Sequence, residues 1–128
     1  MSNDRIVLRS EIKPEYSAET KVRTTIVAAG EHMQLIHATF EPNGTYAMHS
    51  HPHEQMSVVL RGRMRLTVGD EVREVGPGDM WYAPANVMHG GEILGDEALE
   101  FVDVYGPPSK SQWVLDMLER TRAQTESE

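Results

Sequence analysis

The strongest constraint on the fold is a series of short runs, rich in β-branched residues or alternating between apolar and polar ones, that fills residues 24–105. Gly, Pro, Asp and Asn interrupt these runs at the spacing typical of an all-β sandwich or barrel. Gly69-Asp70 predicts a tight hairpin, and the Gly-Pro-Gly-Asp sequence at 76–79 predicts a second turn. The predicted strands are residues 24–28, 33–41, 55–60, 63–68, 71–75, 80–83 and 99–105.

The length of 128 residues fits a single domain with one core. The first 22 residues are polar and irregular, which predicts an N-terminal arm outside the barrel. After two prolines, Ser109 and Gln112 form a capping-box pattern and apolar residues recur at helical spacing, which predicts a short C-terminal helix at about residues 110–122. The expected parts are an arm (1–22), an all-β barrel (23–106) and a C-terminal helix with its tail (107–128).

The composition excludes several classes of protein and of metal site. There is no cysteine, so disulfide bonds and thiolate ligands are excluded. The net charge of −8 argues against a protein that binds duplex nucleic acid, because such binding needs a basic surface. No apolar run approaches the roughly 20 residues of a membrane-spanning helix, and residues 1–5 carry no export signal, so we expect a cytoplasmic protein.

Histidine and glutamine recur at a spacing that suits metal binding. On an extended strand, residues two apart project from the same face, so we expect His49, His51 and Gln55 to lie on one side of the chain. His89 supplies a third imidazole from a second segment. Nitrogen and oxygen donors of this kind accept zinc, manganese, iron or nickel. The sequence therefore predicts one divalent metal ion per chain.

Two motifs in the chain resemble those of the cupins, a family of small β-barrels. The first family motif is a glycine, a His-x-His pair, an acidic residue and a closing glycine, and the second is a glycine, a proline and a histidine. The matching residues are Gly44, His49, His51, Gln55 and Gly62 for the first motif and Gly78, Pro84 and His89 for the second. The resemblance covers about residues 33–105 and implies a jelly-roll β-barrel that holds the metal inside, with the three histidines and Gln55 as ligands.

Gln55 stands where the cupin motif has an acidic residue. Three neutral imidazoles and a neutral amide leave the +2 charge of an ion uncompensated, which favours a strong Lewis acid and an anionic substrate and disfavours oxidation to the 3+ state. Gln55 as a direct ligand competes with Gln55 as a residue that orients a metal-bound water. Glu54 has the opposite strand parity, so it could take the place of Gln55 as a ligand only if a β-bulge interrupted the strand. A hydrogen-bonded polar cluster without metal is the structural alternative.

Three further features have two interpretations each. His37 is either a core or edge histidine or part of the pocket lining. His53 is either exposed to solvent or a residue that supports a ligand. Arg61, Arg63 and Arg65 alternate, and on a strand they form a basic stripe that is either a surface or a clamp for a carboxylate.

Asp103 and Tyr105 are the candidate catalytic residues. They share strand parity, and a carboxylate beside a Lewis-acidic metal can move protons to and from a bound substrate. Residues 103–108 also resemble the tail of the uronate-linearising cupins of pectin breakdown, in which an aspartate, an aromatic residue two positions on and an arginine after two prolines act on an unsaturated sugar acid. Ser109, followed by Lys110, takes the place of that arginine here.

Together these features predict a homodimeric, metal-dependent enzyme, a lyase or an isomerase. The expected substrate is a small, oxygen-rich, anionic molecule such as a sugar acid, and the expected reaction is an elimination, an isomerisation or a ring opening. The alternatives are an iron-dependent dioxygenase and a non-catalytic barrel that binds a sugar or another small molecule, because a fold alone does not fix an activity.

Overall fold

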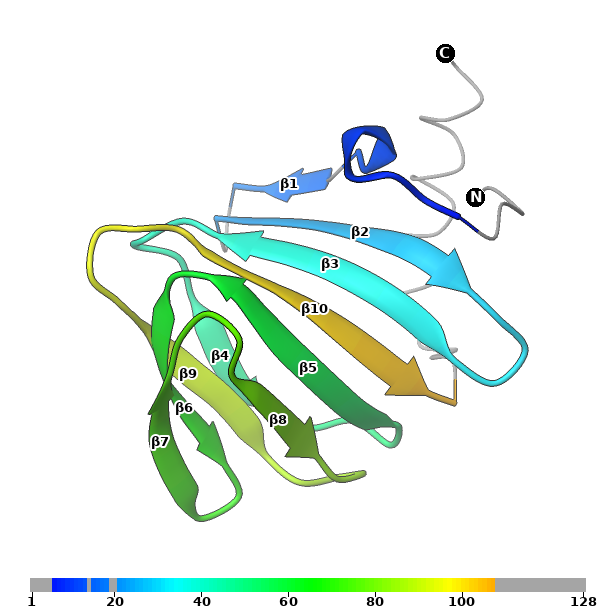
Figure 1. Ribbon diagram of the computed structural model, residues 1–128. Coiled ribbons are helices and arrows are strands. Elements are labelled where there is room, and N and C mark those ends of the chain that lie inside the picture. Colours follow the sequence, from blue (N-terminus) through cyan, green and yellow to red (C-terminus); the bar gives the residue numbers. More distant parts are fainter. Residues whose placement is uncertain (1–5, 14, 19–20, 108–128) are drawn as a thin grey trace.

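Two antiparallel sheets face each other in the computed structural model, which describes residues 6–13, 15–18 and 21–107 (Figure 1). One sheet has six strands in the order β1-β2-β3-β10-β5-β8, and the other has four in the order β4-β9-β6-β7. The elements are η1 (Arg9–Glu11), β1 (Glu15–Ser17), β2 (Val22–Ala29), β3 (Gln34–Phe40), β4 (Tyr46–His49), β5 (Glu54–Arg61), β6 (Arg63–Val68), β7 (Glu71–Val75), β8 (Met80–Ala83), β9 (His89–Leu94) and β10 (Leu99–Gly106). The predicted all-β jelly-roll barrel is confirmed.

Two predictions about the ends and the location of the chain stay open. The C-terminal helix expected at about residues 110–122 lies outside the described residues. Within the described ranges, no helix is long and apolar enough to span a membrane. The cytoplasmic location expected from the sequence stays a prediction.

Besides β1 in the N-terminal arm, two strands of the barrel, β4 and β9, were not predicted from the sequence. β4 has only four residues, and β9 contains Gly90 and Gly91, which weaken the strand signal. The packing shows why glycine is needed here. A Cβ on Gly90 would lie 2.8 Å from the backbone of Met48 on β4, and a Cβ on Gly91 would collide with the side chain of Met64 on β6. The two glycines therefore let β9 lie close between its neighbours, β4 and β6.

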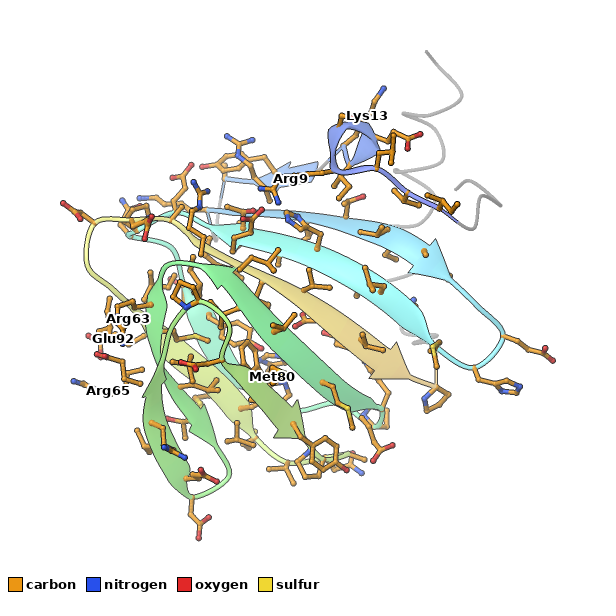
Figure 2. The ribbon with its side chains drawn as sticks, viewed as in Figure 1. Arg9, Lys13, Arg63, Arg65, Met80 and Glu92 are labelled. Carbon is orange, nitrogen blue, oxygen red and sulfur yellow. The ribbon has the colours of Figure 1, made fainter. Side chains whose placement is uncertain are left out.

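The N-terminal arm is partly regular and adds a strand to the larger sheet. β1 pairs with β2, and Arg9 of η1 donates a 2.7 Å hydrogen bond to Glu100 of β10. Glu100 also contacts His37 of β3, with 2.8 Å between the two side-chain atoms. In Figure 2, Arg9 and Lys13 lie above β2 and β3, away from the four-stranded sheet. Contacts within the chain thus hold the described part of the arm against the barrel.

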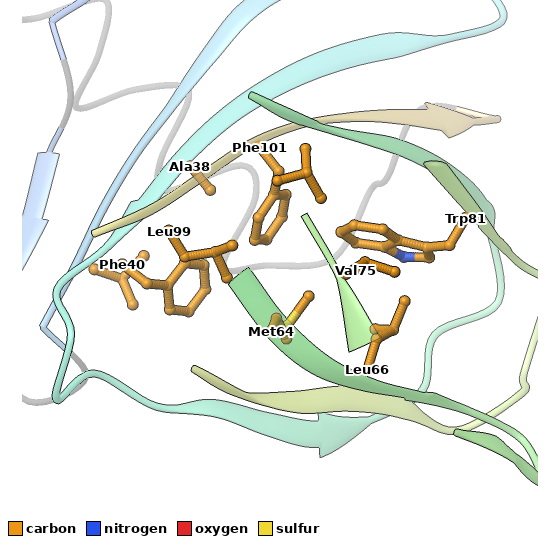
Figure 3. Close-up of a cluster of buried hydrophobic side chains, with 10 residues drawn as sticks. Ala38, Phe40, Met64, Leu66, Val75, Trp81, Leu99 and Phe101 are labelled. Atoms are coloured by element: carbon orange, nitrogen blue, oxygen red, sulfur yellow. The ribbon is translucent and has the colours of Figure 1, made fainter. Parts of the chain in front are cut away.

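Inward-facing positions change from apolar to polar along β10 and its neighbour β5. Phe101 of β10 belongs to the apolar core, whereas Asp103 and Tyr105, the next residues with the same orientation, lie opposite Ser57 and Gln55 of β5. The polar residues therefore lie directly beside the core inside the barrel. The core residues, most of them labelled in Figure 3, are Val22, Ala38, Phe40, Val59, Met64, Leu66, Val75, Trp81, Leu99 and Phe101.

A substitution at Gly62, the closing glycine of the first motif, tests how tightly the turn between β5 and β6 is packed. The φ of Gly62 is 84°, and an added Cβ would overlap the backbone of Ala98 and Leu99. We expect Gly62→Ala to lower the free energy of unfolding by about 3 kcal/mol or more in urea titrations, because a backbone clash adds to the cost of a left-handed conformation.

Gly78→Ala is the matched control for this substitution. The φ of Gly78 is 88°, and no atom lies within 4 Å of a Cβ added there. The left-handed conformation alone should cost about 1–2 kcal/mol. Equal losses for the two variants would show that the clash at Gly62 is relieved at no cost.

The Glu100 cluster predicts a loss of stability in acid. Burial raises the pKa of Glu100, but the hydrogen bond from His37 and the charge of Arg9 outweigh burial, so its pKa lies below the ordinary 4.5. A carboxylate with a lowered pKa stabilises the native state above its unfolded-state pKa, and this contribution is lost as the pH falls through the folded-state value. Between about pH 5 and pH 3, the free energy of unfolding should therefore fall more steeply for the wild type than for Glu100→Gln. Identical pH profiles would refute this.

Candidate metal centre

Three histidines converge inside the barrel from three places in the chain. His49 ends β4, His51 lies between β4 and β5, and His89 begins β9, where it is the cross-strand partner of His49. Their candidate ligand atoms all lie within 4.8 Å of one another. The sequence predicted one extended segment from His49 to Gln55, but residues 50–53 are not in a strand. His51 therefore joins the cluster from a connecting segment, not from the strand alternation that was expected.

Each of these histidines donates its Nδ1–H to a backbone carbonyl two residues away. The pairs are His49 with Ala47 at 2.8 Å, His51 with His53 at 2.9 Å and His89 with Val87 at 2.9 Å. A carbonyl oxygen only accepts, so Nδ1 carries the proton and Nε2 of the neutral ring presents a lone pair. Hydrogen bonds of this kind orient metal-binding histidines.

Burial keeps the rings of His89 and His53 neutral at neutral pH. The pKa of His89 is lowered to about 4, mainly by burial and further by the neighbouring His49 and His51. The hydrogen bond to the backbone of Val87 acts in the opposite direction and raises the pKa. The pKa of His53 is also lowered to about 4, first by burial and then by the nearby histidines. At neutral pH, Nε2 of His89 is therefore free to bind a cation.

Gln55 completes this group of convergent lone pairs. Its side chain is fully buried, and its Oε1 lies 3.1 Å from Nε2 of His51 and 3.1 Å from Nε2 of His89. In the neutral ring, a proton on Nδ1 leaves Nε2 without one, so none of these three atoms then has a proton to share, and they repel one another unless a cation lies between them. Two ligands bound at about 2.1 Å to one ion and at right angles to each other are about 3.0 Å apart. The separations of Gln55 Oε1 from the two histidines therefore fit ligands of one divalent ion.

The amide nitrogen of Gln55 is held from the opposite side. Nε2 donates to Oδ1 of Asp103 at 3.1 Å and to Oγ of Ser57 at 3.0 Å, and the hydroxyl of Tyr46 lies 3.4 Å away. Oδ1 of Asp103 also accepts a hydrogen bond from Ser57, so it carries no proton to donate, and its contact with Gln55 identifies which end of the amide is nitrogen. The amide oxygen consequently faces the histidines.

Asp103 is buried directly behind Gln55. Ser57 donates a 2.5 Å hydrogen bond to the same carboxylate oxygen that Gln55 contacts. Burial raises the pKa of Asp103 to about 7, although the hydrogen bonds from Ser57 and Gln55 lower it. Asp103 is thus separated from the histidine cluster by one side chain, and its predicted catalytic role stays a prediction.

Aromatic rings enclose the cluster. Tyr105 lies against His51 with 5.1 Å between ring centroids, and Tyr46 lies 5.5 Å from His49. His53 stacks on His51, with 4.0 Å between centroids and 11° between planes, and is buried, which favours the supporting role over the solvent-exposed one. Burial raises the pKa of both tyrosines, so their hydroxyl groups stay protonated.

The sequence did not assign Tyr46 to the site. The pairing of β4 with β9 is irregular between Tyr46 and His49. This irregularity breaks the two-residue alternation that would relate the two side chains, so spacing carries no signal for Tyr46.

Glu54 and the arginine stripe lie outside the cluster. Glu54 is exposed and accepts a 2.5 Å hydrogen bond from the hydroxyl of Tyr82, so it is not placed to replace Gln55. Arg63 and Arg65, labelled in Figure 2, form exposed ion pairs, which are Arg63 with Glu74 at 2.7 Å and Arg65 with Glu92 at 3.3 Å. The stripe therefore lies on the exposed surface of the chain, which is either solvated or faces another subunit. His37 contacts Glu100, away from the metal-ligand candidates.

A family model described as a cupin domain matches residues 36–105, which is more than half of the chain. The chain belongs to the cupin family. The match runs from β3 to β10 of this cupin and includes all four candidate ligands.

Solved structures of other cupin-like proteins share the fold. KdgF from Halomonas sp. is 24% identical, with a TM-score of 0.73 over 80% of this cupin and 94% of that chain. An RmlC-like cupin from Shewanella frigidimarina is 16% identical, with a TM-score of 0.75 over 84% and 95%. The polyketide cyclase RemF from Streptomyces resistomycificus is 24% identical, with a TM-score of 0.73 over 84% and 82%. At these identities the likeness shows the fold alone.

A curated relative is the oxalate decarboxylase OxdC from Bacillus subtilis, which is 28% identical over 105 residues. The match covers 78% of this cupin and 26% of the relative, so the chain spans about a quarter of the length of that protein. A decarboxylase and a cyclase thus both resemble this cupin. The reaction has to be argued from the site itself.

Proposed function

We propose that this cupin holds one divalent metal ion through His49, His51, His89 and Gln55 and uses it as a Lewis acid in a lyase or isomerase reaction. The observation that supports this most is the approach of Gln55 Oε1 to two unprotonated Nε2 atoms, each at 3.1 Å. Buried acceptors without a donor between them are costly, and a cation offsets that cost. Zinc, manganese, iron and nickel all accept such donors.

The proposed substrate is a small, oxygen-rich anion such as a sugar acid. A bound ion polarises a substrate oxygen. All four ligands are neutral, so even with the Asp103 carboxylate behind Gln55 a divalent ion leaves net positive charge at the site, which attracts a carboxylate. Neutral ligands also favour the 2+ state of the ion. This supports elimination, isomerisation or ring opening over oxidation by iron.

Tyr105 and Asp103 are the proposed catalytic residues. Tyr105 lies against His51, and its hydroxyl stays protonated, so it can donate a hydrogen bond to a substrate oxygen beside the cluster. Asp103 has a pKa of about 7, near the pH at which a carboxyl group both accepts and gives up protons efficiently. The two residues follow each other on the inner side of β10.

The first test measures metal content and activity together. We expect the purified protein to contain about one divalent ion per chain by elemental analysis and to convert unsaturated uronates, followed by the loss of their ultraviolet absorbance. His51→Ala removes one of four ligands. It should lower metal affinity at least about tenfold and abolish activity, which excess metal should partly restore.

His32→Ala is the matched control, because His32 is exposed in the loop between β2 and β3. This variant should keep the metal content of the wild type. Equal metal content in the two variants, or a wild-type protein that takes up none of the four ions, would rule out the proposed centre. Oxygen consumption by the iron-loaded protein would favour the dioxygenase instead.

We also propose that the chain forms a homodimer through the outer face of the six-stranded sheet. On this face Val104 lies opposite Met56, and Met56 lies opposite Tyr82, in a row across β10, β5 and β8. Val58 and Met80 form the next row. Met56 is 60% exposed, and Met80, labelled in Figure 2, is 74% exposed. Contiguous exposed apolar side chains of this kind mark protein–protein contact surfaces.

The mass in solution tests the dimer. Light scattering coupled to size-exclusion chromatography should give twice the 14.4 kDa of one chain. Met56→Lys should shift the mass toward the monomer, because a buried, unpaired charge opposes association. Val72→Lys, on the exposed side of β7 in the other sheet, should leave the mass unchanged. A monomeric wild type would disprove the proposal.

A further inference from the structure

We infer that Gln55 and Asp103 act as one unit, in which Asp103, in addition to its proposed part in proton transfer, positions the Gln55 amide with its oxygen toward the metal and, when ionised, supplies negative charge that the neutral ligands lack. The inference rests on the proposed metal site. Oδ1 of Asp103 accepts a hydrogen bond from Nε2 of Gln55 at 3.1 Å. On the other side of the same amide, Oε1 lies 3.1 Å from His51 and 3.1 Å from His89.

The carboxamide of Gln55 can rotate so that its oxygen and nitrogen exchange places. That reversed orientation would block metal binding. In that orientation the amide nitrogen would donate its protons to Nε2 of His51 and His89 and occupy the lone pairs that a metal needs. Its oxygen would then lie against Oδ1 of Asp103, where two acceptors repel each other. Ser57 does not oppose the reversal, because a hydroxyl both donates and accepts. The carboxylate of Asp103 therefore selects the orientation that binds metal.

Asp103 also changes the strength of the ligand that it orients. A carboxylate that accepts an amide N–H polarises the amide and increases the electron density on its oxygen. Carboxylates act in the same way on metal-binding histidines. Asp103 is 5% exposed, so water screens its charge little. Through Gln55, it thus delivers to the ion the charge that the acidic residue of the cupin motif would bring directly.

This arrangement accounts for an amide at position 55. Gln55→Glu would remove the N–H that Asp103 accepts and bring two carboxylates into contact in a buried site, which is unfavourable. Combining Gln55→Glu with Asp103→Asn exchanges the two roles. The exchanged pair again has one carboxylate and one amide, so the total charge of the site is unchanged.

The test is a Co²⁺ titration of the metal-free full-length protein, followed by visible absorption, together with thermal melts of the metal-free forms. We expect Asp103→Asn to weaken Co²⁺ binding about 10- to 100-fold, as is usual for residues that support a metal ligand. Gln55→Glu alone should lower the melting temperature of the metal-free protein. Adding Asp103→Asn to it should raise the melting temperature again and return the Co²⁺ affinity to within about threefold of the wild type.

Glu100→Gln is the matched control, because it neutralises another buried carboxylate of β10, which contacts Arg9 and His37. It should leave the Co²⁺ affinity unchanged. Unchanged affinity in Asp103→Asn overturns the inference, and so does a double variant that regains neither affinity nor melting temperature.

Two results separate this inference from the proposed function. A wild type that binds no Co²⁺, or Co²⁺ binding that survives His51→Ala, overturns the metal site itself. Loss of binding in His51→Ala with wild-type binding in Asp103→Asn overturns the inference alone. If Asp103→Asn does not fold by itself, the Co²⁺ affinity and melting temperature of the double variant decide the inference, because that variant keeps the total charge of the site.

Discussion

The pairing of β5 with β10 determines where the core ends and where the polar site begins. Within this pair, Phe101 lies opposite Val59, and the next inward positions place Asp103 beside Ser57. A slip of one residue would turn each of these side chains to the other face of the sheet. The shift in pairing between Glu100 and Phe101 lies just before this stretch, so the register that places Asp103 beside Ser57 and Tyr105 beside Gln55 is set there.

The fold followed from the sequence because its signals are local. Alternating runs and turn residues specify strands and hairpins within a few positions of the chain. β9 was not predicted because Gly90 and Gly91 have low strand propensity and are needed for close packing against the neighbouring strands. The three histidines and Gln55 were found from spacing and motif, yet His51 reaches the cluster from a segment outside the strands. Spacing thus selected histidines that do lie together, although part of the backbone expected to bring them together was wrong, and their role as metal ligands stays a prediction.

The partner of Gln55 was not predictable in the same way. Asp103 is 48 positions from Gln55 in the sequence and meets it only through the register of β5 and β10. Taken alone, the motif suggests that an amide leaves the charge of the ion uncompensated. In three dimensions a carboxylate lies behind that amide, so the charge of the centre depends on two strands.

The anchoring of the imidazoles has a consequence for protein engineering. Main-chain oxygens of residues 47, 53 and 87 hold the rings, and no replacement of a neighbouring side chain removes those oxygens. Libraries that diversify side chains beside the three histidines can therefore leave the hydrogen bonds that orient these rings in place. For directed evolution, the backbone thus fixes the orientation of the imidazoles independently of the side chains around them.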